Sequence, residues 1–335
     1  DIPFGLSGGI RMKIVTLGEI MLRLTSHGYG RFVQTQTFEA NYGGAEANVA
    51  ATLSVWGEDA RFVSKVPAHE MGQAVINTWR SVGVDTRFVL RGGERLGIYF
   101  VERGADSRAS KVIYDRKYSA FSLSEAKEYD LDAIFAGADW FHITGITPAL
   151  GKNAEQLALT ACQEAKKRGL TLSFDVNYRS KLWGTEQARN VSEKLLGYTD
   201  VCIVNENQAL ELFGISGENA MREFAEKYSL RCVAFTYRRT EDALHNRIWS
   251  TLYSEGKSVK SREYRMEMID RIGGGDAFAA GLVYALGHDF ELQRAADFAE
   301  AASCLKHSVP GDVCVCSLDE VLSLAEGKTL GRVSR

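Results

Sequence analysis

The sequence of 335 residues predicts an α/β protein, a three-layer α/β/α sandwich with a mainly parallel central sheet and a small inserted β-sheet lid. Two observations lead to this fold class. Short apolar, β-branched runs alternate with longer helical patterns, and such alternation is typical of a parallel sheet covered on both faces. Two other regions hold strand patterns with little helix between them, and these predict the lid.

The core elements are predicted from this alternation and from glycines placed just after helical patterns, which are common helix stops. In order they are a strand at 13–17, a helix at 45–56 before Gly57, a strand at 60–66, a helix at 70–82 before Gly83, a strand at 139–143, a helix at 153–168 before Gly169, strands at 170–176, 201–204 and 232–236, and helices at 278–286 and 295–305.

The lid is predicted from residues 18–40 and 86–120. Within the second region, residues 97–103 and 110–116 alternate apolar and polar side chains. Strands of this kind have one solvated face and form small antiparallel sheets. We expect them to pack as an insertion on the α/β core.

Composition excludes several classes of protein. The net charge of −3 argues against a general nucleic-acid or anionic-membrane binder, and no apolar run is long enough to cross a membrane.

We expect residues 1–11 to be the remnant of an expression tag, 12–327 the folded domain and 328–335 a tail. The six cysteines form no CxxC pair, and Cys314 and Cys316 alternate along a strand-like stretch as core residues. This usage predicts a cytoplasmic location.

The most informative stretch is Gly273-Gly274-Gly275-Asp276, which precedes an apolar helical run. A helix N-terminus opened by glycines offers unpaired N–H donors to an anion. With Asp276 as general base beside it, the motif suits phosphoryl transfer to an alcohol. The alternative is a glycine-rich turn with Asp276 as N-cap.

A second glycine pair, Gly43-Gly44, also precedes a helix. Glycine allows close backbone approach and unusual backbone angles. We interpret the pair as a hinge for lid closure that also contacts substrate hydroxyls, with Asn48 adding a hydrogen bond. The alternative is a plain turn before a helix.

Residues 41–50 and 270–276 each resemble a signature of the PfkB, or ribokinase-like, family of carbohydrate kinases, and the likeness covers residues 12–327. The resemblance implies the ribokinase-like fold, with ATP and Mg²⁺ as cofactors. It also implies a homodimer or higher homo-oligomer formed through the β lid. It leaves open whether a monovalent cation is needed. Asp276 would be the base, and the amides of Gly273, Gly274 and Gly275 would stabilise the transferring phosphate.

Within that family the chain resembles the group that phosphorylates 2-keto-3-deoxygluconate. The likeness lies in residues 97–100, 114–116, 175–183 and 309–312. It implies that Tyr99, Tyr114, Arg116 and Arg179 hold a sugar acid, and Asp312 is a further candidate substrate-binding residue. An arginine fork binds a carboxylate in a bidentate manner, which agrees with this reading. The alternative for both arginines is surface salt bridging.

For the nucleotide, the resemblance implies contacts from Asn205, Thr236 and Arg238. Gln208 stands where the family's N-x-x-E motif has a glutamate, so the metal ligands stay unassigned. The helix at 295–305 would flank the adenine. Glu300 replaces a frequent asparagine there, and we assign it no base contact.

Two other functions remain open from the sequence. One is a kinase of the same fold for fructose, ribose or tagatose 6-phosphate. The other is a sugar- or nucleotide-binding regulator that has lost catalysis, which the retained Asp276 disfavours and the altered Gln208 leaves possible.

Overall fold

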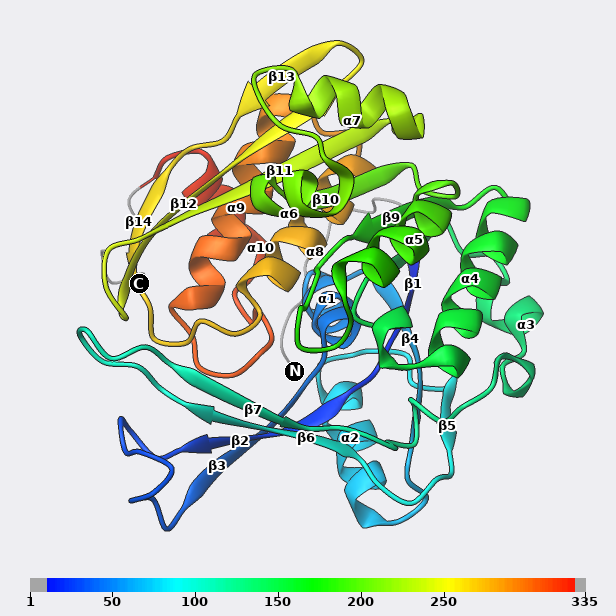
Figure 1. Ribbon diagram of the computed structural model, residues 1–335, viewed down its shortest axis with the longest axis vertical. Coiled ribbons are helices and arrows are strands. Elements are labelled where there is room, and N and C mark those ends of the chain that lie inside the picture. Colours follow the sequence, from blue (N-terminus) through cyan, green and yellow to red (C-terminus); the bar gives the residue numbers. More distant parts are fainter. Residues whose placement is uncertain (1–10, 329–335) are drawn as a thin grey trace.

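The computed structural model describes residues 11–328. The expected tag, apart from Arg11, and the tail beyond Lys328 lie outside the described residues. The described chain forms a large layered body with a second, smaller sheet set across one end of it (Figure 1).

The large sheet is the centre of the predicted sandwich. Its spatial order is β13 (Lys257–Lys260), β12 (His245–Ser254), β11 (Cys232–Thr240), β10 (Val201–Asn205), β9 (Thr171–Asp175), β8 (Trp140–Thr144), β1 (Lys13–Leu17), β4 (Asp59–Val66) and β5 (Val89–Arg91), and β14 (Tyr264–Glu267) pairs with β12. Strands β11, β10, β9, β8, β1, β4 and β5 are parallel, whereas β12, β13 and β14 are antiparallel additions at one edge. The parallel strands therefore bring their carboxyl ends to one side, where open α/β sheets bind ligands.

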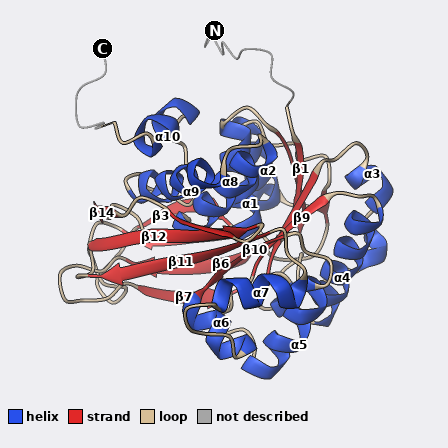
Figure 2. Ribbon diagram, turned by 90° about the horizontal axis from the view of Figure 1, so that it is seen from above, coloured by secondary structure: helices blue, strands red, loops and turns tan. Residues whose placement is uncertain are grey.

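Helices cover both faces of this sheet (Figure 2). One face carries α1 (Ala45–Val55), α2 (Glu70–Ser81), α8 (Gly274–Gly287), α9 (Leu292–His307) and α10 (Leu318–Ala325). The other carries α3 (Leu131–Phe135), α4 (Lys152–Lys167), α5 (Thr185–Leu196), α6 (Glu206–Phe213) and α7 (Ala220–Tyr228). Two short 3₁₀ helices, η1 (Ala126–Glu128) and η2 (Pro148–Leu150), lie in the connections. Strand β1 is covered on both faces. Its adjacent residues Ile14 and Val15 therefore point to opposite faces and belong to separate hydrophobic clusters.

The glycine stops behave as predicted. Gly57, Gly83 and Gly169 have φ values of 93°, 89° and 76°, in the left-handed region that favours glycine. Glycine has a packing role inside α8, where a Cβ on Gly281 would lie 2.7 Å from the Ala299 Cα of α9. The two helices behind the glycine motif can therefore pack closely.

The smaller sheet has the order β3 (Phe38–Gly43), β2 (Met21–Ser26), β6 (Gly97–Glu102) and β7 (Lys111–Asp115). These strands supply the predicted lid, which lies below the main sheet in Figure 1. β5 is close to them in sequence but pairs with β4 of the main sheet.

One element was predicted wrongly. Cys314 and Cys316 lie in irregular structure, because no neighbouring strand pairs with this segment, although both side chains are buried as expected. Among the described helices, none has the length and apolar character to span a membrane.

Candidate active site

The predicted site residues all line one cavity of about 1040 Å³ between the lid and the carboxyl ends of the parallel strands. They are Gly43, Gly44, Asn48, Tyr99, Tyr114, Arg116, Arg179, Asn205, Thr236, Arg238, Gly273, Gly274, Gly275, Asp276 and Asp312. Parallel strands end at the same edge of a sheet, so tertiary structure gathers segments as far apart in the chain as Gly43 and Asp312, which are separated by 269 positions.

The glycine motif opens α8. Gly273 is its N-cap, with a φ of 86° and no side-chain cap, so Asp276 is not the N-cap that the alternative reading required. A Cβ on Gly273 would lie 1.9 Å from the Asp312 carbonyl oxygen, and one on Gly274 would lie 2.1 Å from the His307 ring. Gly275 instead has open space beside it. The unpaired N–H groups of the first turn therefore remain accessible to an anion.

Asp276 lies in this first turn and is partly buried. Asn48 Nδ2 donates to its Oδ2 at 2.7 Å. Burial raises the pKa of Asp276 to about 6 and the charge of Asp312 adds to the rise, while the bond from Asn48 and the charges of Arg179 and Lys306 oppose it. Such a carboxylate is ionised at neutral pH and more basic than an ordinary aspartate, which suits a general base.

Two further acids, which sequence reasoning did not select, line the cavity. Burial and the charge of Asp276 raise the pKa of Asp175, at the end of β9, to about 7. Burial likewise raises the pKa of Glu46 to about 7. Glu46 Oε1 accepts bonds from the Thr144 N–H and hydroxyl, both at 2.9 Å, and from the Thr147 hydroxyl at 2.8 Å. Glu46 lies within the 41–50 signature, and this position was the one feature of the sequence that could have indicated a role in the site.

The lid lines the cavity with an aromatic pair. The Tyr99 and Tyr114 rings stack at 5.9 Å, and Tyr114 is the more exposed of the two. Arg116 is already engaged, because its Nε donates to Glu19 Oε2 at 2.8 Å and its Nη2 binds the same oxygen. In the described part of the chain Arg179 forms no ion pair, and it lines the cavity as an exposed residue.

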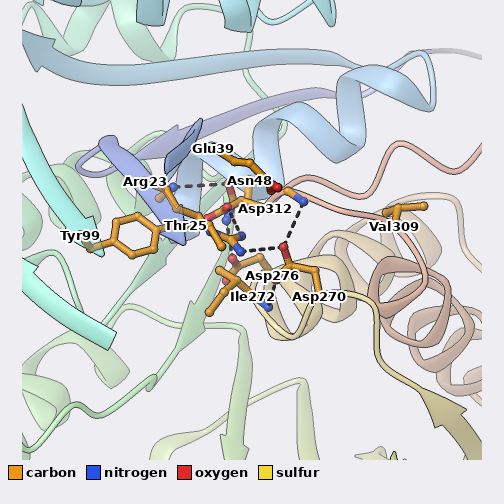
Figure 3. A network of polar contacts seen from close by, with 12 residues as sticks. Arg23, Thr25, Glu39, Asn48, Tyr99, Asp270, Ile272, Asp276, Val309 and Asp312 are labelled. Atoms are coloured by element: carbon orange, nitrogen blue, oxygen red, sulfur yellow. Dashed lines mark hydrogen bonds and ion pairs between the residues drawn. The ribbon is translucent and has the colours of Figure 1, made fainter. Parts of the chain in front are cut away.

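A buried polar network connects the lid to the α8 loop (Figure 3). Arg23 of β2 donates to Asp312 Oδ1 at 2.8 Å and to Asp270 Oδ2 at 2.7 Å, and Tyr99 also donates to Asp312. Asp312 was predicted to bind the substrate, and here its two oxygens accept bonds from Arg23 and Tyr99 of the lid. A Cβ on Gly43 would lie 2.1 Å from Asp312 Oδ2, so glycine is required beside this carboxylate. No motif or periodicity in the sequence indicated that Arg23 would belong to this network.

A second buried cation lies behind the glycine loop. Lys306 is fully buried, and its Nζ donates to the Val309 carbonyl at 3.3 Å. The charges of Asp270 and Asp312 favour its ammonium form, whereas burial lowers its pKa. Its Cε would lie 3.1 Å from a Cβ on Gly273. The loop that carries the anion-binding amides therefore packs directly against this lysine side chain.

The far side of the cavity is formed by β10, β11 and β12. Asn205 caps α6 by accepting from the Gln208 N–H at 2.9 Å, which fixes the orientation of its amide group and leaves Nδ2 to donate. Burial lowers the pKa of Arg238, and the nearby charges of Arg271 and Arg179 lower it further. Arg271 was missed because it looked like a spacer within the glycine motif.

Within residues 11–328, no group of three or more His, Cys, Asp or Glu side chains could hold a metal ion.

Comparison with known proteins gives a consistent family. A model described as pfkB family carbohydrate kinase matches residues 11–315. A 2-dehydro-3-deoxygalactonokinase of Haloferax volcanii is 32% identical over 95% of this chain and 98% of its own length. A 2-dehydro-3-deoxygluconokinase of Thermoproteus tenax is 30% identical over 90% of each chain. The crystal structure of a 2-dehydro-3-deoxygluconokinase from Thermotoga maritima has a TM-score of 0.93 and 43% identity, over 95% of this chain and 99% of that one.

Proposed function

The chain belongs to the pfkB family of carbohydrate kinases, and we propose that it transfers the γ-phosphoryl group of ATP to the C6 hydroxyl of 2-keto-3-deoxy-D-gluconate. The product is the 6-phosphate. The observation that carries the proposal is the position of Asp276, a carboxylate of raised pKa beside the open amides of Gly274 and Gly275. The same cavity holds the unpaired Arg179 for an acidic substrate.

In this reaction Asp276 accepts the proton of the C6 hydroxyl. The oxygen attacks the γ-phosphorus, the bond from that phosphorus to the bridging oxygen breaks, and ADP leaves. The α8 amides hold the charge that spreads over the phosphoryl oxygens. Asn48 orients the base through its bond to Asp276 Oδ2.

Arg179 is the residue we assign to the substrate carboxylate. Its guanidinium forms no ion pair with any residue in 11–328, whereas Arg116 is paired with Glu19 and so holds the lid strand next to the sugar. Tyr99 and Tyr114 offer a flat wall and one exposed hydroxyl. Arg179 is exposed at the edge of the cavity, so it can bind a substrate carboxylate in a bidentate manner, and a neutral sugar offers it no such partner.

Mg²⁺ is proposed to be held mainly by the nucleotide phosphates and water. This ion keeps several waters and needs only one or two carboxylates besides phosphate oxygens. The absence of an acidic cluster among the described residues agrees with such a site. Asn205, Arg238 and Arg271 line the cavity and are proposed to contact the phosphates.

The lid is also proposed to form the contact between two copies of the chain. Val33 is 89% exposed, Tyr118 is 72% and Ile113 is 53%, all within the lid segments. Exposed apolar side chains and strand edges are usually covered in proteins. Light scattering at micromolar concentration is expected to give a dimer or larger, and a monomer would contradict this.

A coupled assay of ADP release tests the activity. Turnover is expected with 2-keto-3-deoxygluconate, and much less with fructose, ribose or tagatose 6-phosphate. The C4 epimer, 2-keto-3-deoxygalactonate, is the second candidate because the H. volcanii relative is named for it. Equal rates with neutral sugars would overturn the sugar-acid assignment, and no turnover with any acceptor would favour a non-catalytic regulator.

A further inference from the structure

We infer that Glu19 is a positioning residue, which sets the angle of the lid and holds Arg116 and the tyrosine wall against the sugar. The inference deepens the proposed function and rests on it for the place of the sugar. Glu19 lies in the short link between β1 and β2, is 3% exposed and lines the cavity.

The place of Glu19 matters because of how the chain enters and leaves the lid. The lid strands come in two consecutive pairs, β2 with β3 and β6 with β7, so the chain crosses between the core and the lid four times. The crossings follow Leu17, Gly43, Arg91 and Asp115. Rigid parts of a protein turn about a few residues at the ends of their elements, so any rotation of the lid has to occur at these crossings.

Glu19 lies in the first crossing and contacts each of the other three. A Cβ on Gly44 would lie 2.0 Å from the Glu19 carbonyl oxygen, and one on Gly97 would lie 2.8 Å from its Oε1. After β7, Arg116 donates to Oε2 through Nε at 2.8 Å and through Nη2, and the Ser119 hydroxyl donates to Oε1. Both carboxylate oxygens therefore bind the protein itself, which indicates that Glu19 acts by holding the crossings together.

Glu19 holds only one edge of the Arg116 guanidinium. Nε and Nη2 face the carboxylate, whereas Nη1 makes no hydrogen bond with any of residues 11–328. Nη1 is not among the enclosed atoms that lack a partner, and Arg116 lines the cavity. This nitrogen is therefore left to donate to an oxygen of the sugar.

The same arginine supports the aromatic wall of the cavity. Arg116 Cζ lies 5.6 Å from the centroid of the Tyr114 ring, which in turn stacks on Tyr99. A guanidinium over the face of a ring is attracted by it. Loss of the Glu19 carboxylate should let the guanidinium turn and the wall move, which weakens binding of the sugar and leaves the donor contacts in place.

The test is a double-mutant cycle with Glu19→Gln and Arg116→Gln, in which the KM values for the sugar and for ATP are measured with the sugar that the wild type phosphorylates fastest. Each single change should raise the KM for the sugar about tenfold and the KM for ATP less than about twofold. Because Glu19 acts through Arg116, the double variant should be no worse than Arg116→Gln alone. Two independent structural effects would instead multiply to about a hundredfold.

Glu102 provides the matched control. It is a lid glutamate that is 2% exposed and accepts from Arg108 at 3.0 Å, but it lies at the other end of β6 and does not line the cavity. Glu102→Gln removes a buried carboxylate charge beside an arginine, as Glu19→Gln does. It should leave the KM for the sugar within about twofold of the wild type.

Several results would overturn the inference. They are an unchanged KM for the sugar in Glu19→Gln, equal rises in both KM values, effects that multiply in the double variant, or the same loss in Glu102→Gln. If Glu19→Gln does not fold, Ser119→Ala removes one partner of the carboxylate, and an unchanged KM for the sugar in that variant refutes the inference. A wild type that phosphorylates only neutral sugars would refute the proposed substrate alone, since the cycle then still decides the role of Glu19. No turnover with any sugar would refute both.

Discussion

Replacement of Asp276 by Asn should remove turnover and stabilise the protein at the same time. The side chain keeps its shape, and the Asn48 amide still has an oxygen to bind at the position of Oδ2. An amide cannot accept the proton of the sugar hydroxyl at neutral pH. General-base catalysis contributes about 10²–10⁴-fold, so kcat should fall by that factor.

The gain in stability follows from the pKa of Asp276, which folding raises from 3.8 to about 6. A raised carboxyl pKa means that the folded protein binds the proton more tightly than the unfolded chain does. Its contribution is fully favourable below pH 3.8 and is lost as the pH rises through about 6. At pH 8 the ionised group costs about 3 kcal/mol at most, at 1.36 kcal/mol per pKa unit.

The assay combines ADP release with thermal unfolding at pH 8 and pH 4. We expect Asp276→Asn to melt a few degrees higher than the wild type at pH 8 and equally at pH 4. Asp289→Asn is the matched control, because Asp289 is exposed and its φ of 53° suits asparagine. A folded Asp276→Asn variant with a rate within threefold of wild type would refute the base assignment. Lower stability at pH 8 would refute the electrostatic reasoning.

Three further predictions concern the same cavity. Arg179→Ala should raise the KM for the sugar acid at least tenfold more than the KM for ATP, since a charge-assisted hydrogen bond contributes roughly 1.5–3 kcal/mol. Equal rises in both KM values, or a similar effect of the exposed Arg239→Ala, would argue against a carboxylate contact. The kcat/KM of the wild type should fall about tenfold per pH unit below about pH 6, because only ionised Asp276 accepts a proton. A flat profile between pH 5 and 8 would exclude that base. Gly43→Ala should lower the melting temperature through a clash worth about 1–3 kcal/mol with Asp312, whereas Gly184→Ala, with open space around its Cβ, should not.

The main features of the fold could be predicted from the sequence because they depend on local patterns. Hydrophobic periodicity located the parallel strands and their helices, and Gly57, Gly83 and Gly169 marked helix ends through their backbone freedom. The segment with Cys314 and Cys316 shows the limit of this reasoning. Alternating apolar residues make a strand only where a neighbouring strand offers hydrogen bonds, and none does there.

The site was predictable where a motif carries its own chemistry. Glycines before a helix followed by an acid indicated an anion site with a base, and the cavity contains them all. Which charges remain free was not predictable. Arg116 and Arg179 looked equivalent in the sequence, but Glu19 neutralises the first and the second stays unpaired among the described residues.

The sequence by itself therefore determined the layered α/β architecture, the helix that begins at the glycine motif and the identity of the candidate base. Only the tertiary structure decided the pKa of that base, the partner of each arginine, and the network that joins Arg23 of the lid to Asp270 and Asp312. The reason is physical. Backbone preferences and periodicity act over a few neighbouring residues, whereas burial and charge pairing depend on which distant segments meet. Arg23 and Asp312 are 289 positions apart and form a bond of 2.8 Å.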